Sequence, residues 1–174
     1  MNVTASISGL NHMAVASAFV LLFALAALSD LRRFVIPNAI VLALGALFVI
    51  ARLLVWDGVA WHSHFGAAAL ILALGLLAYR FRVLAAGDVK LLSVAALWCG
   101  LGHLPALVFA VGIAGAVLAI ALLALRHAIA VLAVARPEVG RIALHRALIL
   151  GEGIPYGLAI AAGSIWTGAR HLIA

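Results

Sequence analysis

The chain has 174 residues, of which 68% are hydrophobic and 9% charged, and it carries a net charge of +6. These few polar residues cannot cover the surface of a water-soluble globule of this length, so the chain is expected in a lipid bilayer. Its long runs of Ala, Leu, Val and Ile do not alternate with polar residues, which favours membrane helices over barrel strands. The composition therefore predicts an all-α, polytopic membrane bundle.

The apolar runs predict about six transmembrane helices, since a span needs about 20 residues to cross about 30 Å of hydrocarbon. In chain order the spans are expected near residues 13–28, 36–55 and 61–79, then as a short and a fuller helix within 89–125, and finally at 154–173. The stretch CGLGHLP, residues 99–105, contains two glycines, a His and a Pro. It is expected to separate the two helices of the long apolar region.

The basic residues predict the orientation, because Lys and Arg of short loops stay on the cytoplasmic side of a membrane. With the N-terminus outside, nine of the eleven basic residues fall in cytoplasmic segments: Arg32, Arg33, Arg80, Arg82, Lys90, Arg126, Arg136, Arg141 and Arg146. Both termini are therefore predicted outside. These charges flank membrane spans without an aromatic platform between them, which indicates contact with lipid and argues against a nucleic-acid partner.

The segment from Arg126 to Gly153 is the longest predicted cytoplasmic connection. It contains RPEVGRIALHRALIL, in which basic and apolar residues alternate at near-helical spacing. Two interpretations stay open, namely an interfacial amphipathic helix and a solvated connection with some apolar contacts.

No metal site is predicted. The seven histidines are dispersed along the chain, and the single cysteine, Cys99, excludes both an internal disulfide and a multi-thiolate zinc site. His62 and His64 are two residues apart, which does not place them on one helix face, and they are expected at the outer membrane interface.

The chain has five acidic residues, and two of them occupy unusual places. Asp57 falls in a turn between predicted spans, and Glu138 and Glu152 fall in the long connection. Asp30 ends the first span and Asp88 begins the fourth, so both are expected at the same, cytoplasmic face of the bundle.

Each of these two carboxylates has a structural interpretation as well as a catalytic one. Asp88 follows Gly87 at a helix start, where an N-cap carboxylate accepts hydrogen bonds from free backbone N–H groups. Asp30 is harder to explain in this way, because a carboxylate at a helix C-terminus meets the negative end of the helix dipole. Pairing with Arg32 or Arg33 would compensate.

Two neighbouring carboxylates also suit peptide hydrolysis, since they share one proton. The ionised carboxylate takes a proton from a water molecule, while the protonated one hydrogen-bonds the scissile carbonyl. This chemistry requires no metal and no cofactor.

Three stretches resemble motifs of the prepilin peptidases, in particular the small Flp-type (tight adherence) enzymes: SDLRRFVIPNAI at 29–40, AAGDVKLL at 85–92 and IPYGLAIAAG at 154–163. The resemblance implies an aspartyl protease of the bacterial cytoplasmic membrane, with its site at the cytoplasmic face and catalytic roles for Asp30 and Asp88. One position departs from the Gly-x-Gly-Asp motif, because Ala85 replaces the first glycine while Gly87 keeps the second. Alanine restricts positive φ, so either the backbone at Ala85 is ordinary or the activity is altered.

Further motif residues are expected to support this site. Pro37 suits the first turn of the second span, and the Asn38 side chain can hydrogen-bond the backbone of that turn. Lys90 either places positive charge near the acids or extends to the headgroups as an ordinary membrane lysine.

Pro155 and Tyr156 begin the last span at the same face, where Tyr156 is open to interpretation as an interfacial aromatic residue. Gly157 and Ala161 form a small-xxx-small pair, which indicates close helix packing.

The resemblance implies a prepilin substrate, with a basic leader followed by an apolar helix. It covers nearly the whole chain, so residues 1–174 are interpreted as one membrane-embedded peptidase domain. Because the chain has one cysteine and no insertion like that of the larger enzymes, no methyltransferase activity is expected. The alternative is a non-enzymatic protein, such as a proton-coupled transporter component with Asp30 and Asp88 as relay groups, although relay carboxylates usually lie near the membrane midplane. The oligomeric state, a homo-oligomer included, stays open.

Overall fold

The computed structural model describes residues 3–55, 60–135 and 153–172, and the regular structure in these ranges is entirely α-helical. The elements are α1 (Val3–Arg33), α2 (Asn38–Leu54), α3 (Trp61–Arg80), α4 (Ala86–Ala135) and α5 (Tyr156–Leu172). Among the described residues, α1, α3 and α4 are long and apolar enough to cross a membrane, and α2 is a shorter apolar helix. The prediction of a helical membrane protein is confirmed, while the number of spans and the outward termini stay predictions.

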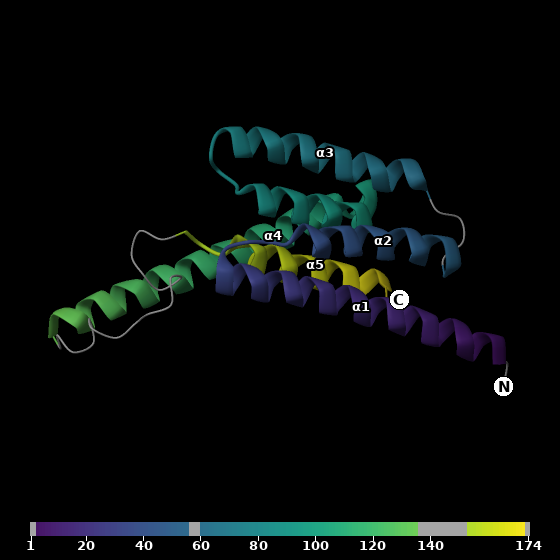
Figure 1. Ribbon diagram of the computed structural model, residues 1–174, viewed down its shortest axis with the longest axis horizontal. Coiled ribbons are helices and arrows are strands. Elements are labelled where there is room, and N and C mark those ends of the chain that lie inside the picture. The colour runs from purple at the N-terminus through teal and green to yellow at the C-terminus, as the bar shows by residue number, and fades with distance from the viewer. Residues whose placement is uncertain (1–2, 56–59, 136–152, 173–174) are drawn as a thin grey trace.

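The helices run side by side and form a bundle with two distinct ends (Figure 1). The C-terminal ends of α1 and α3 and the N-terminal ends of α2, α4 and α5 lie toward one end, and both chain termini lie toward the other (Figure 1). Helix α4 packs against α3 and α5, and α5 packs against α1. The bundle thus brings segments far apart in the sequence to one end.

Helix α4 is interrupted at Gly100, within the stretch that predicts a break. Gly100 has a φ of 67° and a ψ of 175°, so the helix continues in a new direction from Leu101. A left-handed φ is readily accessible only to glycine. The prediction of two helices in this region is confirmed. Pro105 lies five residues beyond the break, inside the second arm of α4.

Side chains of α3 satisfy the backbone at this break. In a continuous helix the Leu101 N–H would donate to the Leu97 carbonyl. Here the Leu101 N–H donates to Ser63 Oγ at 3.0 Å, and His64 Nδ1 donates to the Leu97 carbonyl at 2.8 Å. His64, expected only at the membrane interface, thus has a defined structural role in fixing the angle between the two arms.

Aromatic side chains hold the first arm of α4 against α1 and α2. The Trp98 ring lies 4.8 Å from the Phe19 ring and 5.6 Å from the Phe48 ring, between centroids, in edge-to-face contacts. Trp98 Nε1 also donates to the Leu44 carbonyl at 3.1 Å, which satisfies its polar atom in the core. This cluster fixes the arm that begins at the Asp88 end of the bundle.

The predicted connection from 126 to 153 begins as helix. Helix α4 continues through Arg126 to Ala135, so these residues extend a long helix rather than start a separate one (Figure 1). Residues 136–152, with Glu138 and Glu152, and residues 56–59, with Asp57, lie outside the described part of the chain.

The crossing of α5 over α4 depends on Gly163. A Cβ atom there would lie 2.7 Å from the Val111 nitrogen and 2.9 Å from its Cα, which are backbone atoms that cannot rotate away. Gly163→Ala is therefore expected to lower the free energy of unfolding by about 1–3 kcal/mol, as overpacking does in cores. Thermal unfolding in detergent micelles, followed by tryptophan fluorescence, measures this loss.

The matched control is Gly112→Ala in α4, where a Cβ atom would meet nothing within 4 Å. The thermal unfolding midpoint of this variant should stay unchanged or rise slightly, since alanine favours the helix over glycine. Equal midpoints for both variants would contradict the close crossing.

Candidate active site

Asp30 lies in the last turn of α1 and is 6% exposed. The helix ends because Phe34 adopts a φ of 54°, in the left-handed region, while its N–H donates to the Asp30 carbonyl at 2.8 Å. This conformation is unusual for an aromatic residue and costs on the order of 1 kcal/mol. It turns the chain sharply from α1 into the segment that leads to α2.

The Asp30 side chain is bound by the start of α5. The Gly157 N–H donates to Asp30 Oδ2 at 2.8 Å, and Gly157 is the second residue of α5. The positive end of the α5 dipole and a free N–H group therefore face the carboxylate. The sequence suggested that Arg32 or Arg33 compensates the charge of Asp30 at the helix end, but both arginines are exposed. The start of α5 provides this compensation instead.

Gly157 is required for this contact. A Cβ atom on residue 157 would lie 2.8 Å from Asp30 Oδ2 and 3.0 Å from Asp30 Cβ and Cγ. The sequence indicated close helix packing at Gly157 and Ala161. At Gly157 the group that packs closely is the Asp30 carboxylate side chain.

Asp88 lies in the first turn of α4, as its third residue, and is 8% exposed. Its Oδ2 accepts a long hydrogen bond of 3.4 Å from the N–H of Ala85, the residue before the helix. In a capping box, the side chain of the third helical residue accepts a hydrogen bond from the N–H of the N-cap residue. Asp88 makes this contact with Ala85, so it contributes to the helix start although it is not the N-cap residue itself.

Both carboxylates line one cavity of about 610 Å³ at the shared end of the bundle, and they are near enough to interact electrostatically. The other lining residues come from the segment between α1 and α2, the start of α4 and the segment that leads into α5. The full lining is Asp30, Phe34, Val35, Ile36, Pro37, Asn38, Ala85, Ala86, Gly87, Asp88, Lys90, Gly153, Ile154 and Tyr156. Of the residues that the motifs nominated, all but Pro155 line it, and Pro155 is buried directly beside it.

Asn38 and Lys90 tie α2 to α4 at this cavity. Lys90 Nζ donates to Asn38 Oδ1 at 3.0 Å, so the partner of the Asn38 side chain is Lys90 rather than the backbone of its own turn. Pro37 is the N-cap of α2, with a φ of −63° and a ψ of 135°, and therefore precedes the first turn instead of lying in it. The contact holds the lysine ammonium at the cavity.

The two positions of the Gly-x-Gly-Asp-like motif differ in what they require. Gly87 packs closely on the segment before α2, because its Cβ would lie 3.3 Å from Ile36 Cβ. Ala85 needs no glycine, since the non-glycine residues with positive φ in the described chain are Phe34 and Arg82. The backbone at Ala85 is therefore ordinary.

Tyr156 closes the cavity from the α5 side. Its ring packs on Gly115 of α4, where an added Cβ would lie 2.7 Å from Tyr156 Cε2 and 2.8 Å from its hydroxyl oxygen. Tyr156 is also within electrostatic range of Asp88. An aromatic side chain anchored against α4 thus lines the same cavity as the second carboxylate.

Sequence reasoning gave no role in the site to two groups of lining residues, Phe34, Val35 and Ile36 before α2 and Gly153 and Ile154 before α5, nor to Ala86 beside Gly87. A signal existed for the first group, since any residues between Asp30 and Pro37 must stay at the same end of the bundle. The second group had only its closeness in sequence to Pro155 and Tyr156.

The model of the type IV leader peptidase family matches residues 17–120 of the chain. The chain belongs to this family. No curated protein and no solved structure matches it. The matched residues include Asp30 and Asp88 and end before Tyr156 and Gly157, which the fold brings back to the same cavity. Membership in the family indicates a membrane-bound protease that acts on leader peptides.

The contact between α5 and Asp30 leads to a prediction for Gly157→Ala. The added methyl group must displace the carboxylate or α5, so leader-peptidase activity is expected to fall at least about tenfold, as small misplacements at active sites do. The measurement is kcat/KM for cleavage of a prepilin in detergent micelles. The control Gly45→Ala adds a methyl group in α2 with nothing within 4 Å and should retain full activity; an active Gly157→Ala variant would contradict the role of the contact.

The ordinary backbone at Ala85 predicts that Ala85→Gly, which restores the usual Gly-x-Gly-Asp motif, has little effect on activity. Because no positive φ is required there, kcat/KM should change less than about threefold, the scale set by the backbone entropy of one glycine. The same cleavage assay measures it. A tenfold gain in rate would show that the alanine alters the site.

Proposed function

We propose that this protein is an aspartic endopeptidase that removes the basic leader of Flp-type prepilins at the cytoplasmic face of the bacterial inner membrane. The observation that carries the proposal is the convergence of Asp30 and Asp88, two buried acids from different helices, on one cavity. Buried carboxylates are rarely retained without a partner or a function.

The reaction uses the two carboxylates as one acid–base pair. One carboxylate takes a proton from a water molecule as the water oxygen bonds to the scissile carbonyl carbon, and the other donates its proton to the carbonyl oxygen. In the second half the newly protonated carboxyl gives its proton to the amide nitrogen. The C–N bond breaks, and the other carboxylate regains a proton from the diol. No covalent enzyme intermediate forms.

The walls of the cavity suit a peptide in extended form. The segments 34–37 and 153–155 are non-helical, and residues of both line the cavity together with the ends of α1, α2, α4 and α5. A substrate helix must unwind at the leader junction before its peptide bond can react, because helical hydrogen bonds and side chains enclose it. Lys90 and Tyr156 add polar donors beside the two acids.

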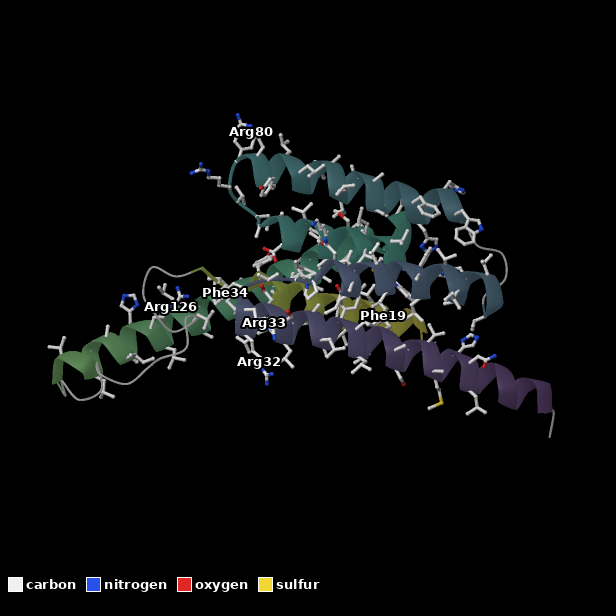
Figure 2. All side chains as sticks on the ribbon, in the orientation of Figure 1. Phe19, Arg32, Arg33, Phe34, Arg80 and Arg126 are labelled. Atoms are coloured by element: carbon white, nitrogen blue, oxygen red, sulfur yellow. The ribbon has the colours of Figure 1, made fainter. Side chains whose placement is uncertain are left out.

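The charges around the site support a cytoplasmic placement. Arg32, Arg33 and Arg80 lie on the end of the bundle that carries the cavity, as Figure 2 shows. All three are exposed, which suits short cytoplasmic loops under the positive-inside rule. A leader cut at this end would remain in the cytosol while the apolar helix of the prepilin stays in the membrane.

The variants Asp30→Asn and Asp88→Asn test the proposal. Each removes one proton-transfer group with little change in shape, so each is expected to lower the cleavage rate at least about 100-fold. The measurement is cleavage of a co-expressed Flp-type prepilin in membranes, with the amount of inserted enzyme checked for every variant.

Asp57→Asn is the matched control, because the sequence places that acid in a turn between spans, and it should cleave normally. Cleavage that survives either of the two site variants would overturn the catalytic assignment. Proton transport in place of cleavage would favour the relay alternative.

A further inference from the structure

Arg126 is a buried cation in the second arm of α4. It is 8% exposed, whereas Arg32, Arg33 and Arg80 are exposed. Its Nη2 donates to the Gly153 carbonyl at 3.0 Å, and Figure 2 shows it on the same end of the bundle as Phe34 and Arg33. The positive-inside rule accounts for the charge of Arg126 but not for its burial.

The acceptor of this hydrogen bond belongs to the wall of the cavity. Gly153 and Ile154 line the cavity together with Asp30 and Asp88, and the chain then passes through Pro155 into α5. Gly157, four residues after the Gly153 carbonyl, donates its N–H to Asp30. Arg126 therefore binds the segment that leads directly to the donor of Asp30.

Packing alone does not fix Gly153. It is exposed, and a Cβ atom on it would meet nothing within 4 Å. A glycine in a non-helical segment has the widest choice of backbone conformations, so its carbonyl direction depends on a hydrogen bond. A hydrogen bond from a guanidinium group is stronger than one from a neutral donor.

We infer that Arg126 is a positioning residue of the active site: by binding the Gly153 carbonyl it holds the 153–155 wall of the cavity and the start of α5 against Asp30. The contact lies outside residues 17–120, the part matched by the family. The inference about structure stands by itself, and its consequence for cleavage rests on the proposed function.

The first experiment measures the wall directly and needs no activity. A nitroxide spin label is placed on Ile154→Cys in a Cys99→Ala background, since Cys99 is the only cysteine. Arg126→Met should raise the mobile fraction of its spectrum at least about twofold, because a released loop segment moves on the nanosecond scale. Arg80→Met, which removes an exposed cation, should leave the spectrum unchanged.

A second label position separates local release from general loosening. Val35 belongs to the segment before α2 that lines the same cavity, and it is 59% exposed, so Val35→Cys can carry the second label. Its spectrum should not change in Arg126→Met. The inference would be overturned if Arg126→Met left the spectrum of the label at position 154 unchanged, or if it changed the spectra of the labels at positions 154 and 35 equally.

The second experiment measures kcat and KM for prepilin cleavage. Arg126→Met should lower kcat about tenfold with a smaller change in KM, because the acids lose their fixed geometry while most substrate contacts remain. Arg126→Lys keeps the charge on a shorter side chain that lacks the planar fork, so it should recover only part of the rate. Arg80→Met should cleave normally.

The lysine variant separates positioning from membrane topology. If Arg126 acted only as a cytoplasmic charge, Arg126→Lys would restore full activity and normal mobility at 154, and the inference would be wrong. If the unmodified chain cleaves no prepilin, the proposed function fails, but the spin-label result still decides the role of Arg126.

Discussion

The hydrogen bond from the Gly157 N–H to Asp30 is the interaction on which the rest of the site depends. Asp30 ends one helix, where the dipole opposes its charge, and Gly157 begins another, where the dipole favours it. The two helix ends compensate each other only if α1 and α5 run antiparallel and meet at the same level. The contact therefore links catalytic geometry to helix packing, and a side chain at position 157 would have to displace the carboxylate or α5.

The remaining parts of the bundle hold the second carboxylate at the same cavity as the first. Asp88 begins the first arm of α4, and that arm is held by Trp98 against α1 and α2. At its far end the arm stops at Gly100, where Ser63 and His64 take over the backbone hydrogen bonds. Because the arm is fixed at several points along its length, the position of Asp88 follows from contacts far from the cavity.

Several features could be predicted from local sequence alone. The break within CGLGHLP was predictable because glycine and proline act on the backbone within a few residues. The shared end of Asp30 and Asp88 followed from alternating span directions. The contact of Asn38 with Lys90 was not predicted, since Lys90 lies far along the chain and only the packing of α2 on α4 brings it close. Arg126 was interpreted through its charge, because nothing in its neighbours in sequence indicates that it is buried.

The sequence by itself determined that the chain is helical and apolar, roughly where its apolar helices lie, and which two acids deserve attention, whereas the N-terminal start of α1 and the C-terminal end of α4 lie about ten residues beyond the predicted spans. Those properties depend on transfer of side chains from water to lipid and on local backbone preferences, which act residue by residue. Only the tertiary structure decided that α5 supplies the partner of Asp30, that Lys90 binds Asn38 and that Arg126 holds Gly153. Each of these is a hydrogen bond between distant segments, and its geometry is set by the distance and rotation of packed helices, which no local pattern specifies.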